Sequence, residues 1–100
     1  MRVFLDDERT TPEGWVRAYT VPQLIGIFKA NTIEELSLDH HLGLDQQTGY
    51  DFMRWLEAEV FADRVQKIPD IYFHTADFVG RAKMQQALDS INRILDAKAR

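Results

Sequence analysis

Short apolar runs alternate with polar and amphipathic stretches along the chain. Residues 1–5 form an apolar run rich in strand-forming side chains, which is typical of a strand buried on both faces. Residues 33–38 and 71–73 are further strand-forming runs. In residues 15–20 the large side chains at positions 15, 17 and 19 alternate with the smaller ones at positions 16, 18 and 20, a pattern that favours a half-exposed strand at the edge of a sheet. We therefore predict four strands.

Amphipathic helices are predicted over residues 21–30, 50–62 and 79–98. In each of them apolar residues recur every three or four positions, so that one face can pack on a sheet. The order along the chain is strand, strand, helix, strand, helix, strand, helix. Strands that alternate with amphipathic helices indicate an α/β domain with right-handed crossovers.

Local signals mark where the predicted helices begin and end. Thr20 with Gln23 predicts a capping box at the start of the first helix, and Asn31 closes that helix. Thr48 is expected to cap the second helix after a glycine-bearing loop over residues 42–49.

We predict one domain, residues 1–100, with a small flavodoxin-like three-layer sandwich. Its four-stranded, mainly parallel sheet has the order 2-1-3-4, and ligands of such sheets bind at the edge where the strands' carboxyl ends lie. Three predicted strands stop on polar residues at this edge. These residues are Asp6 and Asp7 in the first, Asp39, His40 and His41 in the next, and His74 and Thr75 in the last.

The composition narrows the choice of partners. Hydrophobic residues make up 45% and charged residues 28% of the chain, as in ordinary soluble domains. The net charge of -4 argues against a protein that holds a long nucleic-acid duplex through its phosphates. Cysteine is absent, which excludes thiolate sites and fits a reducing compartment. With no signal-peptide core or transmembrane run, we expect a cytoplasmic protein without a membrane partner, and its oligomeric state stays open.

Asp6 and Asp7 are adjacent carboxylates at a strand end, where a divalent cation or hydrogen-bond donors must offset their repulsion. The alternative is that one caps a turn and the other is solvated. Asp39 ends the strand predicted to lie beside the first, so the three carboxylates are expected to share one pocket. Such a pocket suits Mg²⁺ or a similar oxygen-binding cation, or a carboxylate kept partly protonated for acid catalysis.

The three histidines all lie near predicted strand ends. Successive strand residues point to opposite sides, so only one of His40 and His41 is expected to face the site. His74 ends the next strand and faces the same edge. Two imidazoles beside three carboxylates could supply an acid and a base near neutral pH. The alternative is that the histidines are structural.

Arg81 and Lys83 lie in the first turn of the last predicted helix, where cations are disfavoured. A bound phosphate would remove that conflict, because Thr75 and the free N–H groups of the helix start could donate to its oxygens while Arg81 supplies a charged fork. The alternative is a surface ion pair between Arg81 and Asp77. Arg9 could fold back as a second phosphate clamp or remain a surface residue.

These segments resemble the cyclic-phosphate processing receiver domains of bacteria and phages. The matching stretches occur in the expected order over nearly the whole chain, and together they are far more specific than any one alone. They are Leu5-Asp6-Asp7-Glu8-Arg9, Ser37-Leu38-Asp39-His40-His41-Leu42-Gly43, Thr48-Gly49-Tyr50-Asp51, and His74-Thr75 through Val79-Gly80-Arg81 to Met84.

The resemblance implies a receiver-like fold that acts on cyclic phosphate ends or cyclic nucleotides, in RNA repair or nucleotide signalling. It assigns Asp6, Asp7 and Asp39 to an acidic pocket. It also implies two departures from the pattern, because His41 stands where aspartate is common and Asp77 where asparagine is common. No fifth strand with the lysine of phosphorelay receivers is predicted, so we do not expect Asp39 to accept a phosphoryl group.

Our hypothesis from the sequence is a metal-assisted phosphoesterase that opens a 2′,3′-cyclic phosphate at an RNA end or a cyclic nucleotide. Two rivals remain: a module that binds such a phosphate without chemistry, and an interaction domain whose site is vestigial. The hypothesis assigns Asp6, Asp7 and Asp39 to Mg²⁺ or Mn²⁺, Asp39, His74 and His41 to catalysis, and Thr75, Gly80, Arg81 and Arg9 to phosphate binding.

Overall fold

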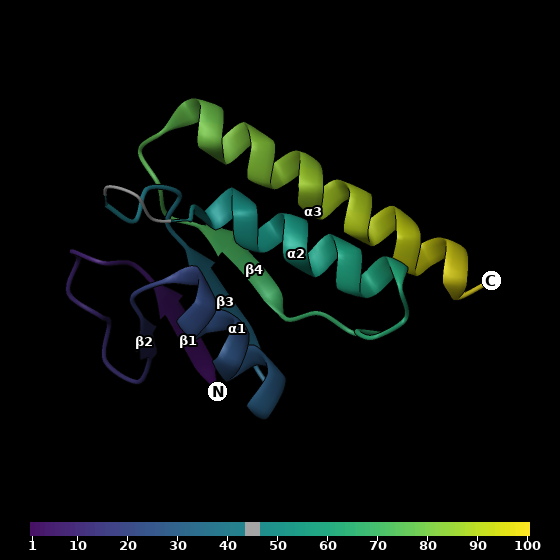
Figure 1. Ribbon diagram of the computed structural model, residues 1–100, viewed down its shortest axis with the longest axis horizontal. Coiled ribbons are helices and arrows are strands. Elements are labelled where there is room, and N and C mark those ends of the chain that lie inside the picture. Colours follow the sequence, from purple (N-terminus) through teal and green to yellow (C-terminus); the bar gives the residue numbers. More distant parts are fainter. Residues whose placement is uncertain (44–46) are drawn as a thin grey trace.

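The computed structural model describes residues 1–43 and 47–100. The predicted loop over residues 42–49 therefore includes a part, residues 44–46, that lies outside the described residues. The described elements follow the predicted order (Figure 1). They are β1 (Arg2–Leu5), β2 (Val16–Ala18), α1 (Val21–Ala30), β3 (Glu35–Leu38), α2 (Gly49–Phe61), β4 (Asp70–Phe73) and α3 (Phe78–Lys98). None of the helices in the described ranges is both long and apolar enough to cross a membrane.

The four strands form one parallel sheet in the order β2-β1-β3-β4, which confirms the predicted sheet. β1 lies between β2 and β3, and its Val3, Phe4 and Leu5 are all buried. β2 lies at the edge, as its alternating pattern predicted. The helix α1 has the predicted bounds, and the bounds of the other elements lie within two residues of the predicted ones.

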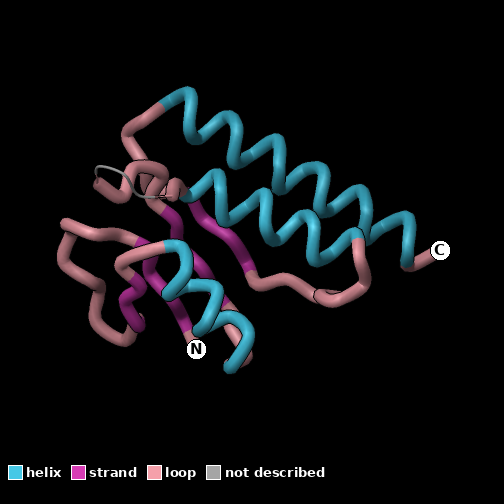
Figure 2. The backbone as a smooth tube through the Cα atoms, in the orientation of Figure 1, coloured by secondary structure: helices cyan, strands magenta, loops and turns pink. Residues whose placement is uncertain are grey.

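All three helices cover the same face of the sheet, so the structure has two layers. Right-handed crossovers from β2 to β3 and from β3 to β4 run in the same direction across the sheet, which places α1 and α2 on one face. α3 then packs beside α2 (Figure 1). The predicted third layer has no helix in the described residues, because a loop links β1 to β2 (Figure 2).

The two faces of the sheet carry different side chains. Val3, Leu5, Leu36 and Leu38 belong to one buried cluster with the helices. The alternate positions on the other face form a row in which Phe4 pairs with Arg17 and Ser37, and Ser37 pairs with Tyr72. Trp15 lies edge-on to Phe4 at 6.3 Å between ring centroids, while Tyr72 is 50% exposed. The loop over residues 6–15 therefore covers only the β1–β2 side of this open face.

The predicted helix caps are present, with one difference. Thr48 Oγ1 accepts a hydrogen bond from Asp51 N, and the Asp51 carboxylate accepts one from Thr48 N, which completes a capping box at α2. Thr20 caps α1 as predicted. Gln23, however, accepts its hydrogen bond from Tyr19 N and not from the cap residue.

Gly49 begins α2 directly against the end of β3. A Cβ atom at this position would lie 2.1 Å from the carbonyl oxygen of Asp39 and 2.9 Å from Met84 Sδ. The Gly49 N–H donates to His40 O at 2.9 Å. Only glycine can therefore stand here without a shift of the Asp39 backbone.

We expect Gly49→Ala to lower the free energy of unfolding by about 3 kcal/mol, because the new methyl group overlaps backbone that cannot move aside. The matched control is Gly26→Ala within α1, where a Cβ meets no atom within 4 Å. That change should raise stability by about 0.5–1 kcal/mol, as expected for alanine in a helix interior. Urea unfolding of the two variants measures both effects, and equal stabilities would contradict the close approach.

Candidate functional site

Three of the predicted site residues meet at the carboxyl edge of the sheet. Asp6, Asp39 and His74 directly follow β1, β3 and β4, and backbone hydrogen bonds from Asp39 N to Leu5 O and from His74 N to Leu38 O extend the strand pairing to them. One potential ligand atom from each lies within 4.8 Å of the other two. By strand alternation, these residues lie on the face that the helices leave open.

The carboxylate of Asp6 is buried and fully hydrogen-bonded. Its Oδ1 accepts from the backbone N–H groups of Glu8 and Arg9, at 2.8 and 2.9 Å. Its Oδ2 lies 3.0 Å from His74 Nε2. Burial acts to raise the pKa of Asp6, but these hydrogen bonds outweigh it and hold the pKa below its ordinary value. Asp6 is therefore ionised at neutral pH.

Both ring nitrogens of His74 have partners. Because the Asp6 carboxylate can only accept, Nε2 carries the proton, and Nδ1 then accepts from Ser37 Oγ at 2.7 Å. The ring also stacks on Phe4, with centroids 4.2 Å apart. Burial lowers the pKa of His74 despite the nearby Asp6 and Asp39, so the ring is neutral at pH 7.

The sequence interpretation did not single out Ser37 and Phe4, although they fix the orientation of His74. A sequence signal for them exists, since each stands two positions before a site aspartate and so shares its face of the strand.

Asp39 has the least engaged carboxylate of this group. Its Oδ1 accepts from His40 N at 2.8 Å, and no other hydrogen bond to its carboxylate occurs in residues 1–43 and 47–100. Asp7, which follows β1 in the loop, is not one of the residues whose ligand atoms meet within 4.8 Å. The predicted pocket of three carboxylates is thus formed by two carboxylates and one imidazole.

The two arginines predicted to bind phosphate hold successive carbonyls of the β4–α3 loop. Arg9 Nη1 donates to His74 O at 2.9 Å, and Arg81 Nη2 donates to Thr75 O at 3.0 Å. Arg81 does not form the alternative ion pair with Asp77. Both guanidinium groups therefore contact the segment that carries His74.

The N-terminus of α3 is already capped, which corrects the prediction that its N–H groups are free. Asp77 Oδ1 accepts from Val79 N at 3.0 Å and Gly80 N at 3.2 Å. Thr75 is buried, and its hydroxyl oxygen accepts from Asp77 N at 3.1 Å. A carboxylate therefore occupies the place that was predicted for a phosphate, as N-cap aspartates commonly do.

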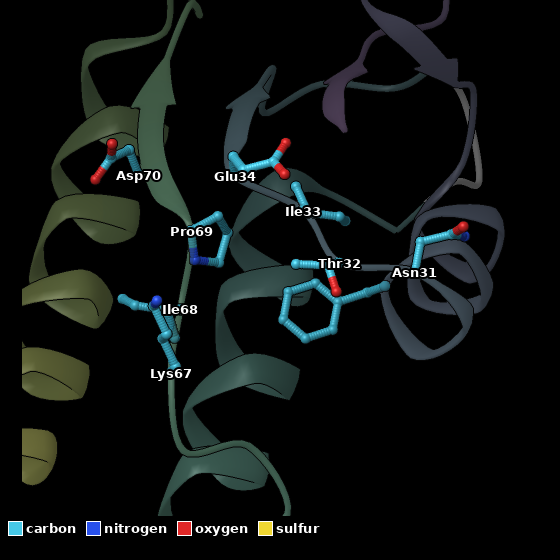
Figure 3. Close-up of a pocket in the computed structure, with 9 residues that line it drawn as sticks. Asn31, Thr32, Ile33, Glu34, Lys67, Ile68, Pro69 and Asp70 are labelled. Carbon is cyan, nitrogen blue, oxygen red and sulfur yellow. The ribbon is translucent and has the colours of Figure 1, made fainter.

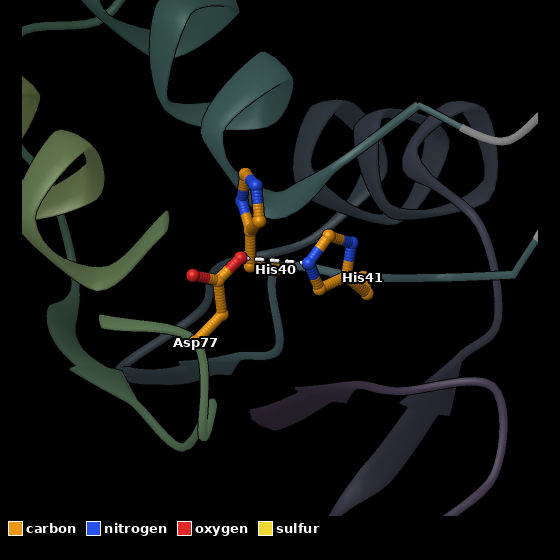
Figure 4. A group of neighbouring side chains, drawn as sticks. All are labelled: His40, His41 and Asp77. Atoms are coloured by element: carbon orange, nitrogen blue, oxygen red, sulfur yellow. Dashed lines mark hydrogen bonds and ion pairs between the residues drawn. The ribbon is translucent and has the colours of Figure 1, made fainter. Parts of the chain in front are cut away.

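A second group lies beside the start of α3 (Figure 4). It consists of His40, His41 and Asp77, whose potential ligand atoms also lie within 4.8 Å of one another. His41 Nε2 is 2.7 Å from Asp77 Oδ2, so these two side chains are in direct contact. His41 thus belongs to this group and not to the group with Asp39 and His74.

The ring of His40 packs against Gly80. A Cβ at Gly80 would lie 2.4 Å from two carbon atoms of that ring, so the glycine makes room for the imidazole. Burial, followed by the neighbouring His41, lowers the pKa of His40 below its ordinary value. This use of Gly80 differs from its predicted role in phosphate binding.

A pocket of about 450 Å³ lies at the opposite end of the sheet (Figure 3). It is formed by the segments that lead into β3 and β4, and it includes Phe28 of α1. None of the predicted site residues lines it. The two side-chain groups at the carboxyl edge, and not this pocket, therefore form the candidate site.

A family model described as the cyclic-phosphate processing receiver domain matches residues 1–90. The matched range contains every residue of both side-chain groups and confirms the resemblance inferred from the sequence motifs. Comparisons with curated proteins and with solved structures found no match.

We expect the protein to lose stability as the pH falls below about 6.5, the ordinary pKa of histidine. The folded chain holds the pKa of His40 and His74 below that value, so the unfolded chain binds these protons first and unfolding becomes easier. The lowered pKa of Asp6 adds a further loss only below about pH 4. Urea unfolding in EDTA at pH 8, 6.5 and 5 measures the slope.

The double variant His40→Gln with His74→Gln should flatten this slope between pH 8 and 5, whatever its absolute stability. A wild-type stability that is constant or rises over the same interval would contradict the neutral state of the two rings.

Proposed function

This chain belongs to the cyclic-phosphate processing receiver family, and from that membership and the geometry of its sheet edge we propose a metal-assisted phosphoesterase that opens a cyclic phosphate ester. The substrates we propose are a 2′,3′-cyclic phosphate at an RNA end and a cyclic nucleotide. The observation that carries the proposal is the meeting of Asp6, Asp39 and His74 within 4.8 Å at the carboxyl edge.

The donor set of this group fits a divalent cation. The two carboxylates suit Mg²⁺ or Mn²⁺, with water completing the coordination, and this leaves His74 with its proton on Nε2. Asp39 offers an oxygen without a partner among the described residues, and Asp6 Oδ2 would exchange its contact with His74 for one with the ion. When bound, the cation would withdraw charge from the phosphate oxygens and lower the pKa of water.

The proposed reaction adds water across one phosphate ester bond. The oxygen of water bonds to phosphorus, the bond from phosphorus to the 2′ or 3′ oxygen breaks, water gives up one proton, and the leaving alkoxide gains one. Asp39 orients the water and accepts its proton, because its carboxylate is the least engaged of the group. His74, with its proton on Nε2, supplies the proton for the leaving oxygen.

The arginines would hold the phosphate in place of the helix N-terminus. Arg81 donates to a neutral carbonyl group, so its guanidinium charge remains available to an anion. Arg9 donates to a carbonyl group and also faces Asp6, with 3.9 Å between Arg9 Nε and Asp6 Oδ2, so an anion would share this guanidinium with Asp6. The N–H groups of Val79 and Gly80 are not available, because Asp77 accepts both. In this proposal Thr75 stabilises the β4–α3 loop and does not bind the phosphate, because its hydroxyl oxygen accepts a hydrogen bond from Asp77 N.

A second candidate function is binding of the cyclic phosphate without chemistry. The observation that favours it is the engagement of both His74 nitrogens, which leaves no free ring atom to exchange a proton with a ligand until a hydrogen bond breaks. In that case the two arginines would be the main contacts of the ligand.

We expect Asp39→Asn to lower kcat for a 2′,3′-cyclic mononucleotide with Mn²⁺ by about 10²–10⁴-fold, the usual contribution of a positioned acid–base group. The matched control is Asp70→Asn at the other end of the sheet, where the exposed carboxylate lies on the first residue of β4. That variant should turn over within about twofold of the wild type. Chromatography that separates the cyclic nucleotide from its ring-opened 2′- or 3′-monophosphate compares the three proteins.

Calorimetry with the same nucleotide separates the two candidate functions. Binding that Arg9→Ala and Arg81→Ala weaken, together with no turnover by the wild type, would contradict the esterase and support the binding module.

A further inference from the structure

We propose that His40, His41 and Asp77 form a binding site for a transition-metal ion such as Zn²⁺ or Co²⁺, distinct from the group of Asp6, Asp39 and His74. The proposal does not depend on the proposed esterase activity. It rests on the arrangement of the three side chains beside the start of α3 (Figure 4).

The distances suit shared coordination. One potential ligand atom from each residue lies within 4.8 Å of the others. His41 Nε2 and Asp77 Oδ2 are 2.7 Å apart, and a shift of less than about 1 Å would give them the separation of about 3.4 Å between tetrahedral ligands with bonds of about 2.1 Å. The His41 side chain is 71% exposed, so its ring can adjust without disturbing the core.

The other two ligands are held in advance by the fold. Asp77 Oδ1 is fixed by the N–H groups of Val79 and Gly80, which leaves Oδ2 directed at His41. The ring of His40 is fixed by its contact with Gly80, where no larger residue would fit. Ligands fixed in this way lose little conformational freedom when they bind an ion.

His40 supplies an independent indication of a missing partner. Its Nδ1 is buried and has no hydrogen-bond partner within the described parts of the chain. Buried polar atoms without a partner are uncommon in folded proteins and call for an explanation. An ion bound through this nitrogen would provide one.

The ligand types select the class of ion. Two imidazoles with one carboxylate favour zinc, cobalt, nickel or iron, whereas magnesium favours oxygen ligands alone. Charges of both signs face His40, because Asp77 and Asp51 favour a cation there while Lys83 opposes one. The chain has three histidines and no cysteine, so the competing group is that of Asp6, Asp39 and His74, which offers one imidazole instead of two.

The test is a titration of the tag-free full chain with Co²⁺ and Zn²⁺. We expect one ion to bind with a visible Co²⁺ absorption, and we expect NMR signals from the rings of His40 and His41 to shift on Zn²⁺ addition while those of His74 stay in place. Shifts confined to His74, or no metal binding by the wild type, would overturn the proposal.

Variants separate the two side-chain groups. Asp77→Asn retains an oxygen that can cap α3, and His41→Ala changes an exposed residue, so both should fold, yet each should weaken Co²⁺ binding at least about tenfold. Asp39→Asn, which keeps an oxygen for His40 N, should leave the affinity unchanged. Affinity lost in Asp39→Asn and kept in Asp77→Asn would place the ion in the other group. Thermal unfolding in EDTA confirms that each variant is folded.

Discussion

The buried carboxylate of Asp6 is the interaction on which the candidate site depends. A charged group without solvent contact must be matched by donors, and here the donors come from two places, the turn that follows β1 and the ring at the end of β4. The same charge thereby shapes the loop that carries Arg9 and fixes the proton of His74 on Nε2. Ser37 completes the arrangement from β3, so the central β1–β3–β4 part of the sheet edge is joined by one chain of hydrogen bonds.

Strand alternation then divides the polar residues of the edge between two sides. Asp39 continues the open face of β3, whereas His40 turns toward the helix layer and contacts the start of α3. No helix in the described residues covers the open face. There the ring of His74 is stacked on Phe4 of β1. Two groups of different ligand character thus arise from neighbouring residues, one rich in oxygen and one rich in nitrogen.

The sequence predicted the strand order, the parallel sheet and the Thr20 and Thr48 caps, because each depends on local pattern and on rules of connection that hold for most sheets. It also predicted that Asp6, Asp39 and His74 converge. It did not predict that Asp7 lies apart, that Asp77 occupies the helix N-terminus, or that His41 pairs with Asp77. Those outcomes depend on the tertiary structure, which decides which of several neighbouring polar side chains lies within hydrogen-bond distance of a given donor. The order strand, strand, helix already implied a loop between the first two strands, and the loop of residues 6–15 is found there.

The contact at Gly49 ties the mechanics of the site to those of the helices. The first residue of α2 is in close contact with the Asp39 carbonyl group and donates a hydrogen bond to His40 O. The end of β3 and the start of α2 are therefore held directly against each other. A displacement of Asp39 by even a few tenths of an ångström is also a displacement of α2, and over its 13 residues the helix acts as a lever about 20 Å long. Its far end carries Phe61, which is 73% exposed. The chain therefore has a stiff connection from its polar edge to a distant apolar point on its surface.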